Sequence, residues 1–348
     1  MTNPFAPIPA LLLLAACAPP LAVETRDALP APVANNAVAF GRDARGEGTI
    51  YSFLGLGAGK TPADIVTRAY ACAEATLDCR EIGDVPVDQG RLAGVAASVG
   101  GRIYIFGGYT VAPDGAEKST PEVFRFDPVT EQYKRVADMP TPVDDTTAIT
   151  LFDRYVYLVS GWHDDGNVAL TQVYDAQLDR WFRATDFPGA PVFGQAGGGD
   201  GSSLLVMGGV KAVVGEDGKR VFVASDEAWI GKVAEAAPDA IDWTRAPPPP
   251  VRPFYRMAAS QGLSVIYFAG GGDNPYNYTG VGYDGVSAKP SDKLIAYDVG
   301  AGDWRVVGET PPSMDHRGLV VGEMGLYVVG GLGSDLGVLS TITRLRTE

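Results

Sequence analysis

The sequence predicts an all-β fold in which six four-stranded antiparallel sheets are arranged around a common axis. Three observations lead to this prediction. A hydrophobic strand ending in glycines, an aromatic–aspartate pair and a later aromatic residue recur at a spacing of roughly fifty residues. Glycine and proline are abundant, at 44 and 26 residues, which favours short strands joined by turns. No segment combines the apolar spacing and the capping residues of a long amphipathic helix.

The first recurring element is an apolar strand that ends in small residues. We expect it to be the second strand of each sheet, because glycine allows the sharp turn and close backbone approach needed near the axis. The copies are GRIYIFGG from Gly101, RYVYLVSG from Arg154, SLLVMGG from Ser203, SVIYFAGG from Ser264, GLYVVGG from Gly325 and a weaker GTIYSFLGLG from Gly48. Six copies predict six sheets.

The second recurring element is a hairpin that supplies the third and fourth strands. An aromatic residue followed by Asp stands seven residues before a second aromatic residue, and a proline follows seven residues later. The polar residues between the aromatic residues supply the turn. The sets are Phe126, Tyr133 and Pro140; Tyr174, Trp181 and Pro188; Tyr297, Trp304 and Pro311; a fourth copy keeps Trp243 and Pro250. One such sheet cannot bury both faces alone, so the copies must stack around an axis.

These residues resemble the kelch repeat, and the resemblance covers nearly all of the chain from residue 21 onward. It implies a six-bladed kelch β-propeller, in which each sheet is a blade with strands a to d numbered outward from the axis. A β-sandwich with coincidental turns is the alternative fold. In a propeller the b–c and d–a loops share one rim, and the a–b and c–d turns share the other.

The two ends of the sequence predict how the ring closes. The chain stops after VLSTITRLRTE, which corresponds to strand c of the sixth copy, and no strand d follows it. The segment LAVETRDALPAPVANNAVAF from Leu21 has the pattern of a strand d, its proline Pro30 and the next strand a. We therefore expect residues 21–28 to complete blade six, which removes free sheet edges that invite aggregation.

The N-terminus has the features of a targeting segment. Residues 8–16 are apolar and end in Leu14-Ala15-Ala16-Cys17, with the small residues that a signal peptidase accepts. This L-A-A-C resembles a bacterial lipobox, which implies a signal peptide over 1–16, a lipidated Cys17 with a short linker over 17–20, and one propeller over 21–348. The n-region departs from the pattern because it has no Lys or Arg. A buried apolar strand with an incidental cysteine is the alternative.

The lipobox resemblance also implies a location. A lipid on Cys17 would anchor the chain to a membrane outside the cytoplasm. Ala18 lacks the acidic residue associated with inner-membrane retention, so the resemblance favours the outer membrane facing the periplasm. The apolar run itself is far shorter than the ~20 residues that a spanning helix needs.

The remaining cysteines form an even pair if Cys17 carries lipid. Outside the cytoplasm Cys72 and Cys79, seven residues apart, can form a disulfide. Cys79 lies seven residues before Pro86, at the position that Trp holds in other copies, and we expect Cys72 in the c–d turn. Two buried free thiols are the alternative. A lone C-x6-C with two histidines in the chain is a poor metal pattern, so we expect no metal and no cofactor.

The charge of the chain limits its partners. The formal net charge is −14, and an acidic surface repels phosphate backbones and anionic lipids. We therefore expect no nucleic-acid partner and no adsorption to membranes by charge. The expected partners are a glycan or a protein, together with a membrane through the lipid anchor, and we expect a monomer.

The irregular b–c loops make the b–c/d–a rim the predicted binding face, because long loops on a rigid scaffold commonly carry binding sites. Aromatic faces, planar amides and arginines suit a sugar or a carboxylate. The candidates are Arg91, Tyr109, Trp162, His163, Asp164, Tyr255, Arg256, Asn274, Tyr276, Asn277, Tyr278, His316 and Arg317. Within them the stretch 274–278 is not required by the repeat and is the first choice for a contact surface.

Two functions remain open at this point. The first is recognition of a glycan or a partner protein on the b–c/d–a rim of a lipoprotein. The alternative is a sugar mutarotase or epimerase, an isomerase, because bacterial extracytoplasmic kelch propellers include mutarotases of sialic acid (N-acetylneuraminate). The sequence offers no match for that family's catalytic residues, and Arg91, Arg256 or Arg317 could hold a sugar carboxylate. A copper oxidase like galactose oxidase is disfavoured because the chain has only two histidines.

Overall fold

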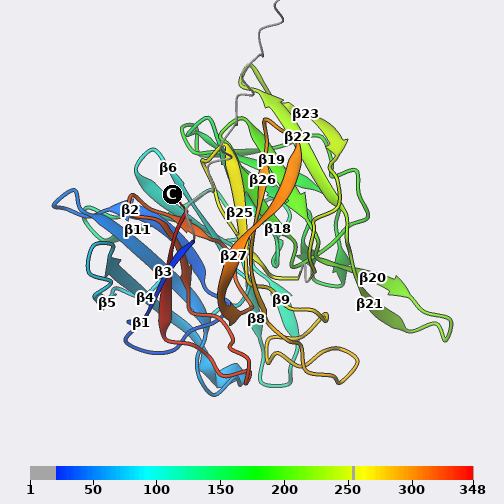
Figure 1. Ribbon diagram of the computed structural model, residues 1–348, viewed down its shortest axis with the longest axis horizontal. Helices are drawn as coiled ribbons and strands as arrows, with labels where there is room; N and C mark the ends of the chain where they lie inside the picture. The colour runs from blue at the N-terminus through cyan, green and yellow to red at the C-terminus, as the bar shows by residue number, and fades with distance from the viewer. Residues whose placement is uncertain (1–20, 253–254, 348) are drawn as a thin grey trace, which may run out of the picture.

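The structure, a computed structural model, describes residues 21–252 and 255–347 and shows a six-bladed β-propeller (Figure 1). Each blade is a four-stranded antiparallel sheet whose strands follow one another outward from the axis. Blade one contains β2 (Ala37–Arg42), β3 (Gly48–Leu56), β4 (Ile65–Ala73) and β5 (Cys79–Ile82). Blade two contains β6 (Val95–Val99), β7 (Arg102–Phe106), β10 (Val123–Asp127) and β11 (Gln132–Val136).

The next three blades repeat this order. Blade three contains β12 (Ala148–Leu151), β13 (Tyr155–Val159), β16 (Thr171–Asp175) and β17 (Arg180–Arg183). Blade four contains β18 (Ala196–Gly199), β19 (Ser203–Met207), β22 (Ala228–Ala234) and β23 (Ala237–Arg245). Blade five contains β24 (Ala258–Ala259), β25 (Val265–Ala269), β26 (Ser291–Asp298) and β27 (Asp303–Ser313).

Blade six joins the two ends of the chain and confirms the predicted closure. Its strands are β28 (Val320–Val321), β29 (Leu326–Val329), β30 (Thr341–Arg346) and, as the outermost strand, β1 (Ala22–Asp27). β1 runs antiparallel to β30 in a continuous register from Ala22↔Arg346 to Asp27↔Thr341. Arg344 strengthens this seam with an ion pair to Glu24 at 3.1 Å. The ring is therefore closed by main-chain hydrogen bonds between residues far apart in sequence.

Three of the b–c loops carry small hairpins of their own. They are β8 (Tyr109–Val111) with β9 (Glu117–Ser119), β14 (Trp162–His163) with β15 (Gly166–Asn167), and β20 (Val210–Val214) with β21 (Arg220–Ala224). The β20–β21 hairpin projects from the body of the propeller (Figure 1). The described residues contain one helical segment, a 3-10 turn over Pro62–Asp64, and no helix long and apolar enough to cross a membrane.

The repeated aromatic residues pack where the repeat predicts. Tyr174 and Trp181 are direct cross-strand partners with ring centroids 5.1 Å apart, and Trp181 also packs edge-on against Phe106 of the preceding blade at 5.9 Å. Tyr297 and Trp304 form the same pair at 4.9 Å. Because each pair fills the space against a neighbouring sheet, the hydrophobic core lies between blades rather than within one of them.

The disulfide between Cys72 and Cys79 is present. Its location corrects one detail of the prediction, because Cys72 lies in strand β4 and not in the c–d turn. Cys72 pairs directly with Cys79 across the hairpin, in the register that Tyr174 and Trp181 use in blade three. The disulfide therefore replaces the whole cross-strand aromatic pair of the repeat and not only its Trp.

Candidate functional site

Six equivalent residues stand where each d–a loop reaches the axis. In every blade the residue just before this position forms an isolated bridge with the end of strand b or with the b–c loop, as Asp144 does with Trp162 and Tyr255 with Gly272. The d–a and b–c loops therefore share one rim. The six residues all adopt a left-handed backbone with φ between 46° and 69°, and they are Asn35, Ala93, Asp145, Gly194, Arg256 and Asp315. This conformation is uncommon outside glycine, so the shared geometry is imposed by the turn.

Backbone hydrogen bonds connect these six turns to one another around the axis. The Asp145 N–H donates to Ala93 O at 3.3 Å, the Gly194 N–H to Asp145 O at 2.8 Å, and the Arg256 N–H to Gly194 O at 2.8 Å. On the other side of the ring the Asn35 N–H donates to Asp315 O at 3.1 Å. These hydrogen bonds hold the turns close together at the b–c/d–a rim, so the centre of the propeller is narrow there.

Two arginines and two aspartates fill the centre of this ring, and we call them the axial ion cluster. Arg256 donates to both carboxylate oxygens of Asp145, at 3.1 Å from Nε and 2.7 Å from Nη2, and its Nη1 lies 3.3 Å from Asp315 Oδ1. Arg317 Nη2 lies 2.8 Å from Asp145 Oδ1 and 3.5 Å from Asp315 Oδ1. Asn35 donates to Asp315 at 3.0 Å. All four charged side chains are at most 4 % exposed.

The charges within the axial ion cluster balance. Burial raises the pKa of Asp145, but the charges of Arg256 and Arg317 outweigh it and hold that pKa below its ordinary value. Burial lowers the pKa of Arg256, but Asp145 and the other groups around it outweigh this effect and raise it well above its ordinary value. Two positive guanidinium groups thus face two negative carboxylates. Because the cluster as a whole has no net charge, each buried charge is compensated by a neighbour of opposite sign.

Aromatic residues cover the cluster from the b–c/d–a side. Arg256 lies against the faces of Tyr255 and Tyr276, with 4.8 Å and 5.1 Å between its guanidinium carbon and the ring centroids. Both tyrosines are buried, and the Tyr255 hydroxyl donates to Tyr276 O at 3.2 Å. The blade-five loop that carries Tyr276 also packs Tyr278 against Leu56, Leu92 and Tyr109 of blades one and two. This loop therefore crosses the axis and closes it on this rim.

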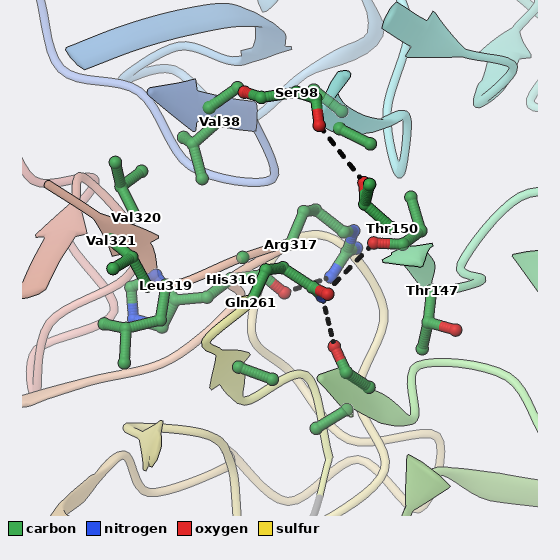
Figure 2. A pocket seen from close by; sticks show the side chains of 18 of the residues that line it. Val38, Ser98, Thr147, Thr150, Gln261, His316, Arg317, Leu319, Val320 and Val321 are labelled. Carbon is green, nitrogen blue, oxygen red and sulfur yellow. Dashed lines mark hydrogen bonds between the residues drawn. The ribbon is translucent and has the colours of Figure 1, made fainter. Parts of the chain in front are cut away.

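A cavity of about 340 Å³ occupies the axis on the other side of the cluster (Figure 2). All six innermost strands contribute to its wall, through Val38, Ala96, Ala148, Gly197, Ala259 and Val320 among others. Asp145, Gln195, His316 and Arg317 line the end next to the ion cluster, and the a–b turn residues Asp153, Gly201 and Gly262 line the other end. Asp153 and Gly262 are exposed to solvent. The cavity is thus closed at the b–c/d–a rim and opens at the a–b/c–d rim.

Four polar atoms on residues that line this cavity are buried and lack a hydrogen-bond partner. They are Thr147 Oγ1, Gln195 Oε1, Gln261 Oε1 and Arg317 Nε. Buried polar atoms are nearly always hydrogen-bonded in native proteins, so these four atoms are exceptions to the rule. The rest of the wall is largely apolar, with Val38, Met257, Leu319 and Val320 among the contributors.

His316 adds an uncharged imidazole to the closed end. Its Nε2 lies 2.9 Å from Ser313 Oγ, and the residue is buried. Burial lowers the pKa of His316 to about 3, and the charge of Arg317 contributes to the same shift. At neutral pH the closed end therefore contains a neutral imidazole next to a guanidinium group.

The structure divides the candidates predicted from the sequence into three groups. His316 and Arg317 line the cavity. Tyr255, Arg256 and Tyr276 form the closure of the axis and are buried. The remaining candidates lie on the b–c/d–a rim and are Arg91, Tyr109, Trp162, His163, Asp164, Asn274, Asn277 and Tyr278. Cys17 lies outside the described residues.

Several rim candidates have partners within the protein. Arg91 forms an ion pair with Glu122 at 2.8 Å and is 5 % exposed. Trp162 Nε1 donates to Asp164 O at 2.7 Å, and Asn274 donates to Asp284 at 2.9 Å. Within the stretch 274–278, Tyr276 holds Arg256 in place, so at least part of it serves the closure of the axis.

Sequence reasoning missed Thr147 and Gln261, which line the cavity. Gln261 lies in the a–b turn of blade five and donates to Ala148 O at 3.2 Å and to Gly197 O at 3.1 Å, carbonyls of blades three and four (Figure 2). Neither residue belongs to the repeated pattern. The spacing of residues along the sequence does not indicate which polar side chains reach the axis. Among the described residues no group of three or more His, Cys, Asp or Glu side chains could hold a metal ion.

Comparison with known proteins agrees with this architecture. Residues 90–140 match the Kelch motif. The chain is 32 % identical over 114 residues to "Kelch-like protein 15" of Gallus gallus, which is 33 % of this chain and 23 % of the relative. It is 25 % identical over 178 residues to "Beta-scruin" of Limulus polyphemus, which is 50 % of this chain and 18 % of the relative. The chain thus spans less than a quarter of the length of these relatives.

A solved structure matches nearly the whole chain. "Structure of YjhT" superposes with a TM-score of 0.70, covering 92 % of this chain and 99 % of the other at 15 % sequence identity. At that identity the likeness establishes the fold alone. Together with the Kelch motif match and the six phased blades, it shows that this chain is a kelch β-propeller that resembles YjhT at the level of the fold.

Proposed function

We propose that this kelch propeller binds a small organic molecule in its axial cavity, with a carbohydrate as the class that the wall suits best. The observation that carries the proposal is the axial cavity of about 340 Å³, closed at one rim, whose largely apolar wall brings Gln195, His316 and Arg317 together at the closed end. Protein sites for small molecules are concave, of roughly 300–1,000 Å³, and mostly apolar with a few convergent polar groups. Sugars present both C–H surfaces and hydroxyls, which match such a wall.

A cavity-filling variant tests this proposal. Thr150 lies on β12, lines the cavity and is partly exposed, and its hydroxyl donates to Ser98 O at 3.3 Å (Figure 2). Thr150→Phe should occupy part of the cavity and abolish the thermal stabilisation that sugars give to the wild-type protein. Thr130→Phe, on an exposed c–d turn, is the matched control and should respond like the wild type. Stabilisation that survives in Thr150→Phe would place the ligand elsewhere.

A second candidate is a sugar mutarotase or epimerase acting in the same cavity. It is the function that the resemblance to extracytoplasmic kelch propellers implies, and His316 and Arg317 are the ionisable side chains that we propose to test for it at the closed end. Opening of a cyclic sugar requires a base that takes the proton of the anomeric hydroxyl and an acid that protonates the ring oxygen. Anomer exchange followed by NMR tests this function. If the anomers exchange no faster with the protein than without it, the protein is not a mutarotase and binding is the function that remains.

The b–c/d–a rim is the place that we propose for a partner protein. Its β20–β21 hairpin exposes Val213, Val214, Val221 and Val223, and Val214 is 79 % exposed. Exposed apolar side chains gathered on one projecting element are common at protein interfaces. Affinity capture with the wild-type protein and with a variant lacking residues 211–223 tests this. If the wild type and the variant recover every bound protein in equal amounts, the hairpin is not the binding surface.

We further propose that the protein is an extracytoplasmic lipoprotein anchored through Cys17. β1 begins at Ala22 opposite Arg346, at the a–b/c–d rim, and runs toward the d–a rim. An anchor a few residues before Ala22 would hold the a–b/c–d rim, and with it the cavity mouth, near the membrane. Cys17→Ala should release the protein from the membrane fraction. A variant that stays in that fraction would count against the anchor.

A further inference from the structure

The turn that the disulfide closes in blade one lies against blade six, where the two ends of the chain meet. Cys72 lies near the end of β4 and Cys79 at the start of β5, and residues 74–78 form the turn between these strands. Cys72 is buried in a core cluster that also contains Tyr327 and Ile342 of blade six. The disulfide therefore lies at the interface between the first and the last blade.

Glu74 is the centre of the contact between this turn and blade six. The residue is buried, and its carboxylate accepts hydrogen bonds from the Tyr327 hydroxyl at 2.8 Å and from the Met324 N–H at 2.6 Å. The main-chain carbonyl of Glu74 accepts a hydrogen bond from the Arg344 guanidinium group, which also lies over the Tyr327 ring. Because Tyr327 belongs to β29 and Arg344 to β30, the turn binds two strands of blade six.

The same turn also contacts β1, the strand that closes the ring. Arg26 of β1 donates a hydrogen bond to Thr76 O, and its Nη2 lies 3.6 Å from the Asp78 carboxylate. Arg344, which the turn binds, pairs with Glu24 of β1 at 3.1 Å. The turn thus contacts the strand that the N-terminal segment contributes, both directly and through β30.

These contacts take the place of one that other blades make through the aromatic residue of strand d. In blades two to five that side chain donates a hydrogen bond to a carbonyl of the preceding blade, as Trp181 Nε1 does to Ala137 O at 2.9 Å and Trp304 Nε1 to Pro247 O at 2.8 Å. Blade one has Cys79 at this position, and a disulfide sulfur has no hydrogen to donate. The turn therefore supplies polar contacts with the preceding blade.

We infer that the disulfide and the turn of residues 74–78 form a redox-sensitive latch that holds β1 and keeps the ring closed. A dithiol reductant releases it: the reductant's two thiols become a disulfide, and their two electrons and two protons convert Cys72 and Cys79 to thiols. Without the bond the ends of the turn can separate, which weakens its contacts with β29, β30 and β1. An oxidising compartment keeps the latch closed. This role is independent of what the axial cavity binds.

The first experiment measures hydrogen–deuterium exchange of the folded full chain by mass spectrometry, with and without dithiothreitol. Alkylation of Cys72 and Cys79 verifies that the bond is reduced. We expect the amides of β1 and β30 to exchange about tenfold faster or more after reduction, while blades three and four keep their rates. The Cys72→Ala, Cys79→Ala double variant should behave like the reduced protein and ignore dithiothreitol. An equal rise in every blade, or a bond that stays oxidised in the folded protein, would overturn the latch.

The second experiment asks whether the disulfide acts through the turn. Glu74→Ala removes the carboxylate that accepts two hydrogen bonds from blade six, so it should speed exchange of the β1 amides as reduction does. In the double cysteine variant Glu74→Ala should add little, because the turn is already released. Asp179→Ala is the matched control: it changes the c–d turn of blade three, where the carboxylate accepts from the Ala137 N–H at 2.8 Å, and should leave β1 unchanged. If the effects of Glu74→Ala and of disulfide removal simply add, the bond does not act through the turn and the inference is wrong.

Discussion

Arg256 and Asp145 form a two-pronged ion pair at the centre of the propeller, although 111 residues separate them in sequence. Arg256 comes from the loop that enters blade five and Asp145 from the loop that enters blade three. The pair joins blades three and five across the axis. Together with the loop that carries Tyr276, it closes the axis on the b–c/d–a side.

Removing Arg256 should destabilise the protein strongly. Arg256→Met is close in length, but it leaves the carboxylates of Asp145 and Asp315 buried with less compensation. We expect a loss of about 3–5 kcal/mol in the free energy of unfolding, measured by urea denaturation. Arg183→Met is the control, because its ion pair with Asp186 is exposed to solvent and exposed pairs contribute little to stability. A loss in Arg256→Met no larger than in the control would show that the buried pair does not stabilise the ring.

His316 should make stability depend on pH in mildly acidic solution. Its pKa is about 3 in the folded protein and 6.5 ordinarily, so between these values the unfolded chain binds one more proton than the folded one. Stability should therefore fall as the pH is lowered through this window, by about 1.4 kcal/mol per pH unit for this group. His316→Gln should reduce that slope by the same amount between about pH 4.5 and pH 6.

The control for this prediction is His163→Gln, which replaces the other histidine of the chain and lies on the β14 hairpin. Free energies of unfolding are measured by urea denaturation at several pH values for the three proteins. An unchanged slope in His316→Gln would mean that the imidazole protonates as readily in the folded state as in the unfolded one.

Breaking the disulfide should cost less than breaking the ion cluster. The bridge closes a short loop, because Cys72 and Cys79 are seven residues apart. For a loop of this size the loss expected from chain entropy is about 2 kcal/mol. A Cys72→Ala, Cys79→Ala double variant should show this loss, and reductant should lower the stability of the wild type but not of the variant. Sensitivity of the variant to reductant would point to another cause.

Removing the N-terminal strand should open the ring. A chain that starts at residue 28 lacks β1, so the outer edge of β30 has no partner. We expect oligomers or aggregates in size-exclusion chromatography with light scattering, because unpaired edge strands pair with other chains. A synthetic peptide of residues 21–28 should restore the monomer. A truncated chain that remains monomeric would contradict the role of β1 in closure.

Much of the architecture could be predicted from local pattern. The spacing of the glycine pairs and aromatic residues indicated six blades, and the absence of a strand d at the C-terminus indicated closure by residues 21–28. Both predictions are confirmed because each copy is a local unit whose hairpin register follows from residues close in sequence. The pairing of Cys72 with Cys79 was predicted for the same reason, although the strand position of Cys72 was not.

The location of the cavity could not be predicted in this way. The long b–c loops drew attention to the b–c/d–a rim, but the loop that carries Tyr276 closes the axis there, and the cavity opens at the rim of the short a–b turns. Thr147 and Gln261 carry no motif, and only the tertiary structure shows that they line the cavity.

The sequence by itself determined the number of blades, the strand order within them and the way the ends join, since those features depend on residues that are neighbours in the chain or in one hairpin. Only the tertiary structure decided which end of the axis is closed and which polar atoms lack partners. Those features depend on side chains from different blades, such as Arg256, Asp145 and Arg317, meeting at the axis. The distances between such residues depend on how the six sheets pack around the axis, so they cannot be predicted from the spacing of residues along the sequence.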